Sequence, residues 1–230
     1  PFVELNPYRE VLSKANEFVG YLPNAETVEP DTKLGLDDMF ELVRKADEDY
    51  RTLQEKKEKL KQKIEEYRAK QQIVAPFRPL ECDLHRVLHY RYITYRFGRI
   101  AVEFYHKMQK YLMDDLKAIF VEGERDESYV YGVYFVSQAE TQKVDAVFRS
   151  LHFERIELKD EFEGTPDTAY RVLENEIARV NLEIEDLDKQ AGEMLADRAP
   201  QLVAARDRLE ELSNNFDVRK LAARMEDKQE

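Results

Sequence analysis

The chain is poor in glycine and in cysteine. Only 7 of its 230 residues are glycine, whereas 37% are charged. This balance is typical of long, solvated helices and not of a globular enzyme with many tight turns. The single cysteine, Cys82, has no second cysteine with which to form an internal disulfide. The sequence therefore predicts a protein of a reducing compartment.

Long apolar runs and positive charge are also scarce. No apolar run approaches the roughly 18 residues of a membrane span, so we expect no direct membrane insertion by this chain. The formal net charge of -12 disfavours general binding to nucleic acids or to anionic membranes. No signal peptide is recognisable, and the sequence begins at Pro1 without a methionine. We therefore expect a processed chain or a fragment.

Two long stretches carry heptad spacing, which predicts coiled-coil helices. In the first stretch the seam positions are Met39, Val43, Ala46, Tyr50, Leu53, Lys57, Leu60, Ile64, Tyr67, Gln71 and Val74. Only Lys57 and Gln71 interrupt its apolar character. The second seam runs from Tyr170 to Ala191, slips by one residue, and continues from Leu195 to Phe216, with Pro200 near the slip.

The two stretches are expected to pair with each other as an antiparallel hairpin. From Met39 to Val74 there are 10 Lys/Arg and 8 Asp/Glu, whereas from Pro166 to Ala199 there are 4 and 9. This opposite charge balance favours pairing between the two helices over self-pairing. If Ala75 lies opposite Pro166, the start of the first helix falls level with the irregularity near Pro200, which supports this register.

The segment between the seams alternates helical and strand patterns. The expected strands are Arg91–Phe97, Ile119–Glu122, Tyr129–Ser137 and His152–Leu158; the expected helices are Leu80–Leu88, Val102–Leu116 and Thr141–Leu151. A turn is expected at Gly123–Asp126. The order after the first helix is β-α-β-β-α-β, which predicts a small split-βαβ lobe.

The predicted fold class is therefore α+β, a long antiparallel coiled-coil helical hairpin that carries this lobe at its tip. A short helix is also expected from Pro7, after an Asn6 N-cap, to about Val19. The chain divides into a partial near lobe with a linker helix (1–35), an outgoing coiled-coil helix (36–76), a distal α/β lobe (77–164) and a returning coiled-coil helix (165–230).

The stretch FEGTPDTAY, Phe162 to Tyr170, offers two interpretations. A phosphate-binding loop needs several glycines and usually a lysine, but here Gly164 stands among acidic residues. The alternative is a helix start, in which Thr165 is the N-cap, Pro166 the first helical residue and Asp167 a complement to the helix dipole. The residue types favour the helix start.

Three stretches carry a family likeness: PFVELNPYREVL near the N-terminus, RFGRI at Arg96–Ile100, and FERIELKDEFEGTP at Phe153–Pro166. Together with the order of a long helix, a small α/β lobe and a long returning helix, they resemble the N-terminal cytoplasmic region of subunit I of bacterial and archaeal V/A-type rotary ATPases. This subunit is the counterpart of eukaryotic V-ATPase subunit a. The resemblance covers nearly the whole chain.

The resemblance implies a non-catalytic stator element on the cytoplasmic face of the membrane. Its implied partners are the peripheral-stalk heterodimer, which docks on the distal lobe, and other membrane-sector and rotor-cap subunits. Compared with the family, the chain lacks the first strands of the near lobe and the C-terminal membrane domain. It is therefore not expected to conduct ions by itself, and the resemblance leaves open whether the ATPase moves protons or sodium ions.

Arginines and tyrosines gather around the first expected strand of the lobe. Because these residue types are enriched at interface hot spots, we predict a protein-docking surface formed by Arg91, Tyr92, Tyr95, Arg96 and Arg99. Plain alternation of core and solvent faces along a strand is the other interpretation. Stacking of RNA bases on the same residues, together with Arg86, Tyr90 and Phe97, is a third.

The sequence predicts no catalytic, cofactor or metal site. Cys82, His85 and His89 have a spacing compatible with three zinc ligands, but no fourth ligand is evident. Carboxylate pairs such as Glu65-Glu66 are typical of solvated helix faces, and no serine lies in a nucleophile motif. The alternative to a stator, from another class, is a coiled-coil adaptor or an RNA-binding helical arm.

Overall fold

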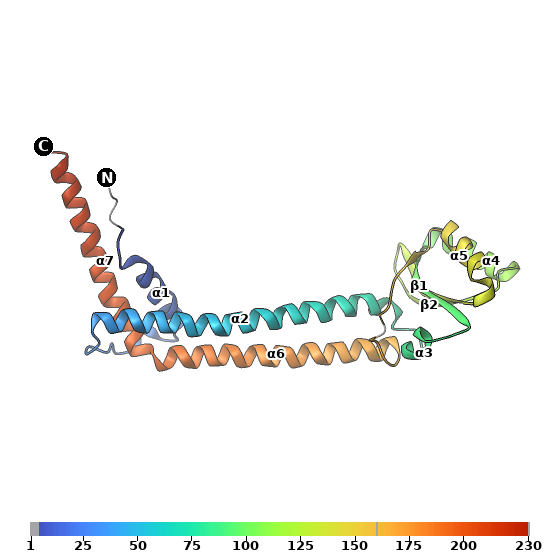
Figure 1. Cartoon of the computed structure of the whole chain (residues 1–230), viewed down its shortest axis with the longest axis horizontal. Helices are drawn as coiled ribbons and strands as arrows, with labels where there is room; N and C mark the ends of the chain where they lie inside the picture. Colours follow the sequence, from blue (N-terminus) through green and yellow to red (C-terminus); the bar gives the residue numbers. More distant parts are fainter. Residues whose placement is uncertain (1–4, 160, 230) are drawn as a thin grey trace. The chain divides into compact units, whose positions relative to one another are not determined.

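The fold is α+β, as the sequence predicted, with long helices packed together and a four-stranded antiparallel sheet. The computed structural model describes residues 5–159 and 161–229. The chain divides into two compact units: Pro1–Lys61 with Leu182–Glu230, and Gln62–Asn181. Helices α2 (Leu36–Val74) and α6 (Pro166–Asp197) contribute to both units (Figure 1).

The first unit is helical. It contains α1 (Arg9–Gly20), a 3₁₀ turn η1 (Ala25–Thr27), α7 (Ala199–Asp227) and portions of α2 and α6. Helix α1 lies beside α7 (Figure 1), and both contribute to one apolar core that includes Phe18, Leu202 and Leu209. Burial of these side chains supplies the main driving force for packing this unit.

Helix α1 begins two residues later than the sequence predicted. The carboxamide oxygen of Asn6 accepts a hydrogen bond from the backbone N–H of Tyr8 at 2.9 Å, which makes a turn in front of the helix. The nitrogen of the same side chain donates to the hydroxyl of Ser213 at 2.9 Å and to Asp217 at 3.2 Å. Asn6 thus attaches the entry of α1 to α7 instead of acting as the N-cap.

The heptad seams are confirmed. Every predicted seam position, in both stretches, is buried or half-buried. In the first unit, the Lys57 side chain is 21% exposed and its Nζ lies 2.7 Å from Asp188 of α6. In the second unit, the Gln71 carboxamide donates to the backbone oxygen of Tyr170 at 3.3 Å. The two polar seam residues therefore occupy seam positions and satisfy their polar ends across the helix pair.

The irregularity near Pro200 is a boundary between two helices. Helix α6 ends at Asp197 and α7 begins at Ala199, with Arg198 between them at φ -102° and ψ 6°. Pro200 has no N–H to donate to the preceding turn, so an unbroken helix is disfavoured there. The Pro200 carbonyl accepts a hydrogen bond from the backbone N–H of Asp31 at 3.0 Å. The returning segment is therefore two helices.

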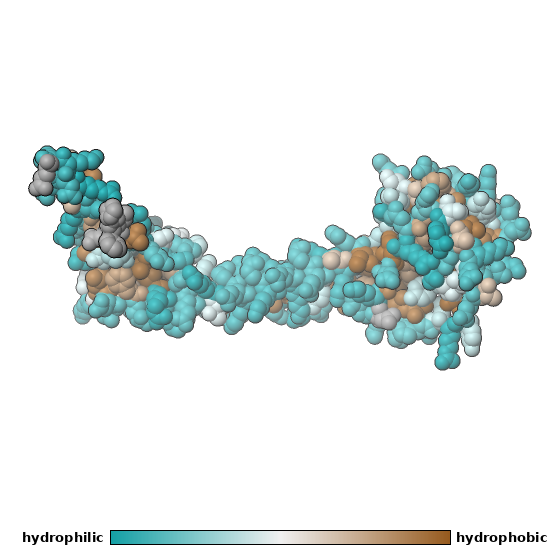
Figure 2. Space-filling view, turned by 45° about the horizontal axis from the view of Figure 1, so that its top comes forward, coloured by the Kyte–Doolittle hydropathy of each residue, from teal (hydrophilic) through white to brown (hydrophobic). Residues whose placement is uncertain are grey.

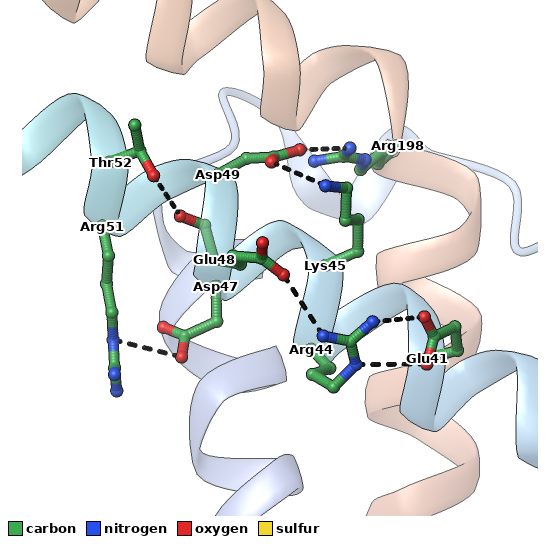
Figure 3. A network of polar contacts seen from close by, with 9 residues as sticks. All are labelled: Glu41, Arg44, Lys45, Asp47, Glu48, Asp49, Arg51, Thr52 and Arg198. Carbon is green, nitrogen blue, oxygen red and sulfur yellow. Dashed lines mark hydrogen bonds and ion pairs between the residues drawn. The ribbon is translucent and has the colours of Figure 1, made fainter.

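Arg198 attaches this boundary to α2. Its guanidinium lies 2.7 Å from the Asp49 carboxylate, and the Lys45 ammonium approaches the other oxygen at 3.3 Å (Figure 3). The hydrogen bond from Arg198 lowers the pKa of Asp49 below its ordinary value. Figure 3 also shows Arg44 between Glu41 and Glu48 on the same helix. These ion pairs are exposed, and each exposed pair contributes little to the stability of the fold.

The second unit contains the sheet. Its strands are β1 (Ile93–Ala101), β2 (Ala118–Arg125), β3 (Tyr129–Ser137) and β4 (Glu154–Arg155), in the order β2-β3-β1-β4. All pairings are antiparallel. With the helices α4 (Val102–Asp114) and α5 (Thr141–Ser150), the chain order is β-α-β-β-α-β, as predicted.

Two apolar cores lie on opposite faces of this sheet. On one face, α4 and α5 cover Ile100, Tyr134 and Val136 (Figure 1). On the other face, Phe97 and Val133 pack against the end of α2 and the start of α6, together with the short turn η2 (Ala75–Phe77) and helix α3 (Leu84–Leu88). The sheet is therefore buried on both faces near its centre.

Four local predictions in this unit needed correction. Helix α3 begins at Leu84 and not at Leu80, because Asp83 caps it by accepting from the N–H of Arg86. Strand β1 runs from Ile93 to Ala101, shifted from the expected 91–97. The turn after β2 falls at residues 126–128, where Asp126 accepts from the N–H groups of Ser128 and Tyr129.

The fourth correction concerns the last strand, which was expected to span residues 152–158. Only Glu154 and Arg155 pair as strand β4, opposite Arg99 and Gly98. His152 has a left-handed backbone, with φ 59°, which is incompatible with an extended strand there. After Ile156, which donates to the Phe97 carbonyl at 2.8 Å, the chain leaves the sheet.

The glycine of the RFGRI motif has a steric reason. A Cβ at Gly98 would lie against the backbone oxygen of Glu154 and 2.5 Å from the Phe153 ring. Its partner across the ladder is also a glycine, Gly132, where a Cβ would meet the Phe120 ring and the Val121 carbonyl at 2.5 Å. The absence of a side chain at Gly98 lets β4 and the Phe153 ring approach β1 closely.

The start of α6 is as predicted. Gly164 has φ +73°, the left-handed region that favours glycine, and α6 begins at Pro166. The Thr165 hydroxyl accepts from the N–H of Thr168 at 3.2 Å, which is the N-cap bond. The Asp167 carboxylate pairs with Arg78 at 2.9 Å. The motif thus positions a helix start, in agreement with the structural interpretation.

The visible surfaces of the long helices α2 and α6 are mostly hydrophilic (Figure 2). Within residues 5–159 and 161–229, no helix combines the length and the hydropathy needed to cross a bilayer.

Candidate docking surface

The predicted docking residues lie on and just before β1, in the second unit. Arg91 and Tyr92 precede the strand and are exposed, Tyr92 to 76%. The carbonyl of Tyr92 accepts a hydrogen bond from the N–H of Gln138 at 3.0 Å, which fixes the backbone at this point beside the end of β3. Among the five predicted residues, these two present the largest freely accessible side chains.

Arg96 points toward α5, where it joins a buried carboxylate. Its guanidinium lies 3.3 Å from Asp145, whose side chain is only 10% exposed. Arg155 of β4 contacts the same carboxylate at 3.1 Å, and the Tyr134 hydroxyl donates to it at 2.5 Å. Burial, and then the hydrogen bond to Asp145, raise the pKa of Tyr134 well above its ordinary value. Two guanidinium groups thus share one carboxylate, which leaves one net positive charge.

Arg99 and Tyr95 occupy the opposite face of β1. The Arg99 guanidinium pairs with Glu154 at 2.6 Å and lies 3.9 Å from the centre of the Tyr129 ring. The Tyr95 ring lies edge-on to Phe97, with 5.7 Å between the ring centres, and packs with the apolar core on this face. The predicted residues are therefore divided between the two faces of the strand, as alternation requires.

A groove of about 660 Å³ runs beside the first half of β1. One wall is formed by Tyr90, Arg91 and Ile93–Phe97, and the other by Arg155–Lys159, where the chain leaves the sheet. Among the described lining residues four are cationic, namely Arg91, Arg96, Arg155 and Lys159, and one, Glu157, is acidic. In a chain of net charge -12, this is a local concentration of positive charge.

The other candidate sites gain no support from the geometry. Cys82 lies ahead of α3 and is half-buried, and burial raises the pKa of its thiol. His89 contacts the carbonyl oxygen of His85 at 2.7 Å through Nδ1. Among the residues that the structure describes, no three His, Cys, Asp or Glu side chains are placed to hold a metal ion.

The basic and aromatic residues considered for RNA stacking are not gathered on one open platform. Phe97 is buried, Tyr95 is half-buried, and Arg86 lies on α3. Arg96 and Arg99 point to opposite faces and each holds a carboxylate. This arrangement differs from a sheet face on which neighbouring aromatic rings stack bases.

Sequence reasoning missed Asp145 and Arg155, which determine where Arg96 points. Asp145 follows the buried Val144 on α5 and lies three residues before the buried Phe148. A carboxylate so close to the apolar stripe of a helix is the one signal in the sequence, because buried carboxylates need a positive partner. The identity of that partner depended on the sheet register, which pairs Gly98 with Arg155.

The comparisons with known proteins concern the fold. No protein family and no curated protein matches the sequence. Among solved structures, the chain is similar to one described as the "cytoplasmic N-terminal domain of subunit I, homolog of subunit a, of V-ATPase". The TM-score is 0.50 and the identity 12%, and the match covers 91% of this chain and 70% of that one. The chain therefore has the fold of the domain that its sequence motifs resemble.

Proposed function

We propose that the chain is a non-catalytic stator element of a V/A-type rotary ATPase that translocates protons or sodium ions. The observation that carries the proposal is the coincidence of two likenesses. The motifs RFGRI and FERIELKDEFEGTP resemble subunit I, and the fold matches a subunit I domain over 91% of the chain. The chain would act on the cytoplasmic face of the membrane, in a protein whose membrane domain lies outside this sequence.

The helices suit a part that must resist torque without doing chemistry. Helix α2 has 39 residues, or about 58 Å at 1.5 Å per residue. In each unit it packs along α6 through an apolar seam, and two paired helices bend less than one. Their outer faces are charged and solvated, so attachment to a partner falls to the α/β part of the chain.

We assign the four functional segments accordingly: 1–35 as part of a near lobe and its linker helix, 36–76 and 165–230 as the hairpin, and 77–164 as the docking lobe. Within this lobe the proposed contacts to the peripheral-stalk heterodimer are Arg91, Tyr92, Tyr95, Arg96 and Arg99. Other membrane-sector and rotor-cap subunits would contact the remaining segments, and no cofactor or nucleic acid takes part.

The test is calorimetric titration of the chain with the stalk heterodimer of the same organism. Tyr92→Ala removes an exposed aromatic side chain that makes no contribution to the apolar cores. We expect at least a tenfold loss of affinity with the lobe still folded, because hot-spot aromatics cost about 2 kcal/mol or more when truncated. Tyr111→Ala, on the exposed side of α4, is the matched control and should leave affinity unchanged.

The alternative function, a coiled-coil adaptor or an RNA-binding helical arm, predicts different binding partners. A gel shift with tRNA at physiological salt should show no complex if the chain is a stator element, because its net charge of -12 opposes the phosphate backbone. Binding to tRNA together with failure to bind the stalk heterodimer would replace the stator proposal.

A further inference from the structure

At Ile93, the start of β1, the structure describes no strand on the side away from β3. Strand β3 pairs with β1 along its whole length, from Ile93 to Ala101. On the other side, β4 pairs only with Gly98 and Arg99. Within the described residues, no strand lies on that side of β1 between Ile93 and Arg96, and the groove of about 660 Å³ occupies this place.

Two hydrogen bonds establish which backbone groups face this groove. Gln138 donates to the Tyr92 carbonyl from the β3 side, and Ile156 donates to the Phe97 carbonyl from the β4 side. The N–H and C=O groups of one strand residue point to the same edge, and successive residues alternate. The backbone N–H and C=O groups of the odd-numbered residues of β1 therefore point away from β3. Ile93 thus directs its N–H and C=O toward the groove.

The side chains around this edge are sorted by face. Arg96 and Arg155 lie on the α5 face, where they share the Asp145 carboxylate and keep one net positive charge. Ile156 packs with the apolar core on the opposite face, and Ile93, 44% exposed, lies on that face by alternation. A strand entering the groove would therefore meet cations on one side and apolar groups on the other.

Two further cations extend the positive field. Arg91 and Lys159 line the groove and are exposed, and of the lining residues that the structure describes only Glu157 is acidic. These four cations outnumber Glu157 and Asp145, which lies behind Arg96 and Arg155, so the described part of the lining is net positive. An acidic occupant is the complementary one, because a like-charged segment would be repelled.

We propose that this groove binds an acidic, extended peptide segment of a partner, which adds as a strand to the edge of β1 with its carboxylates toward Arg96 and Arg155. Main-chain hydrogen bonds to Ile93 would supply affinity, and the two faces would supply specificity. The proposal rests on the proposed function in taking β1 as the docking strand, and it adds the chemistry of the segment that docks there.

The test uses the whole chain and a capped seven-residue peptide that alternates valine and glutamate. Titration is followed by NMR of the amide groups. We expect binding in the micromolar to millimolar range, with slower amide exchange at Ile93 and no change at Thr94, whose N–H points toward β3. The corresponding valine–lysine peptide should bind at least tenfold more weakly.

Two variants separate strand addition from side-chain attraction. Ile93→Pro removes an N–H that takes no part in the β1–β3 ladder, and we expect it to weaken peptide binding at least tenfold. Ile93→Ala keeps the N–H and should weaken binding less. Lys159→Glu should weaken binding severalfold, whereas Lys143→Glu, on the exposed side of α5, should not.

Several results would overturn the proposal: no binding of the valine–glutamate peptide at millimolar concentration, equal binding of the lysine peptide, or binding without protection of the Ile93 amide. The amide measurement is made on the unmodified chain and so holds even if a variant fails to fold. If the chain binds the peptide but not the stalk heterodimer, only the stator proposal fails. If it binds the heterodimer but not the peptide, only this inference fails.

Discussion

Substitution of Asp145 by asparagine tests how the second unit holds its positive groove. The carboxylate is 10% exposed and serves Arg96, Arg155 and the Tyr134 hydroxyl. Breaking a buried ion pair by removal of one partner costs about 3–5 kcal/mol. Here the cost is smaller, because Arg96 and Arg155 are 28% and 50% exposed and recover some hydration, and because asparagine keeps one oxygen for the tyrosine.

We therefore expect Asp145→Asn to lower the free energy of unfolding by about 2–3 kcal/mol. Urea unfolding followed by tyrosine fluorescence is suitable, since the chain has 13 tyrosines and no tryptophan. The same change at the exposed Asp115 should cost less than about 0.5 kcal/mol. An Asp145→Asn variant as stable as that control would show that the carboxylate does not hold the two arginines, and the assigned faces of the groove would fail with it.

Three further predictions concern the helices and the sheet. Lys57→Leu should raise the melting temperature by a few degrees in a circular dichroism melt, because leucine fills a seam position and Asp188, 52% exposed, returns to water; an unchanged or lower value would contradict the seam assignment. Because Arg198 lowers the pKa of Asp49, this pair stabilises the fold above the ordinary pKa of 3.8 and the stabilisation is lost as pH falls through the lowered value; urea unfolding at pH 7 and pH 3 should show Arg198→Gln losing less stability on acidification than the unmodified chain, and an equal loss would refute the linkage. Gly98→Ala should cost at least about 2 kcal/mol in urea unfolding, because its Cβ meets backbone as well as a ring, and a cost under about 0.5 kcal/mol would mean that β4 moves away freely.

The long helices were predictable because their signal repeats. Each heptad adds an independent apolar position, so the polar exceptions at Lys57 and Gln71 did not obscure the pattern, and both are half-buried as seam residues should be. The start of α6 was predictable for a different reason. Thr165 and Pro166 form a local signal whose chemistry is complete within four residues.

The errors fell where a distant residue decides the local structure. The residues after Arg155 have strand propensity, but the left-handed His152 and the departure after Ile156 shorten β4 to two residues. Alternation along the strand was enough to place Arg96 and Arg99 on opposite faces. It was not enough to identify the carboxylates with which they pair. Asp145 and Glu154 become neighbours of Arg96 and Arg99 only through the sheet register and the packing of α5.

The sequence was enough to predict which region of the chain carries the docking surface, but not the shape of that surface. Its arginines and tyrosines mark the neighbourhood of β1 in the sequence. The open edge beside Ile93 exists because β4 is short. No local sequence pattern predicts the length of β4. A groove formed by a strand that ends early is a tertiary feature, and it is the part of the site that only the structure supplied.

The proposed stator role is tested most directly by the affinity of the chain for the peripheral-stalk heterodimer of the same organism, measured by titration calorimetry at physiological salt. We expect a one-to-one complex that Tyr92→Ala weakens at least tenfold and Tyr111→Ala leaves unchanged. A chain that is folded by circular dichroism and shows no heat of binding at tens of micromolar heterodimer would contradict the stator role.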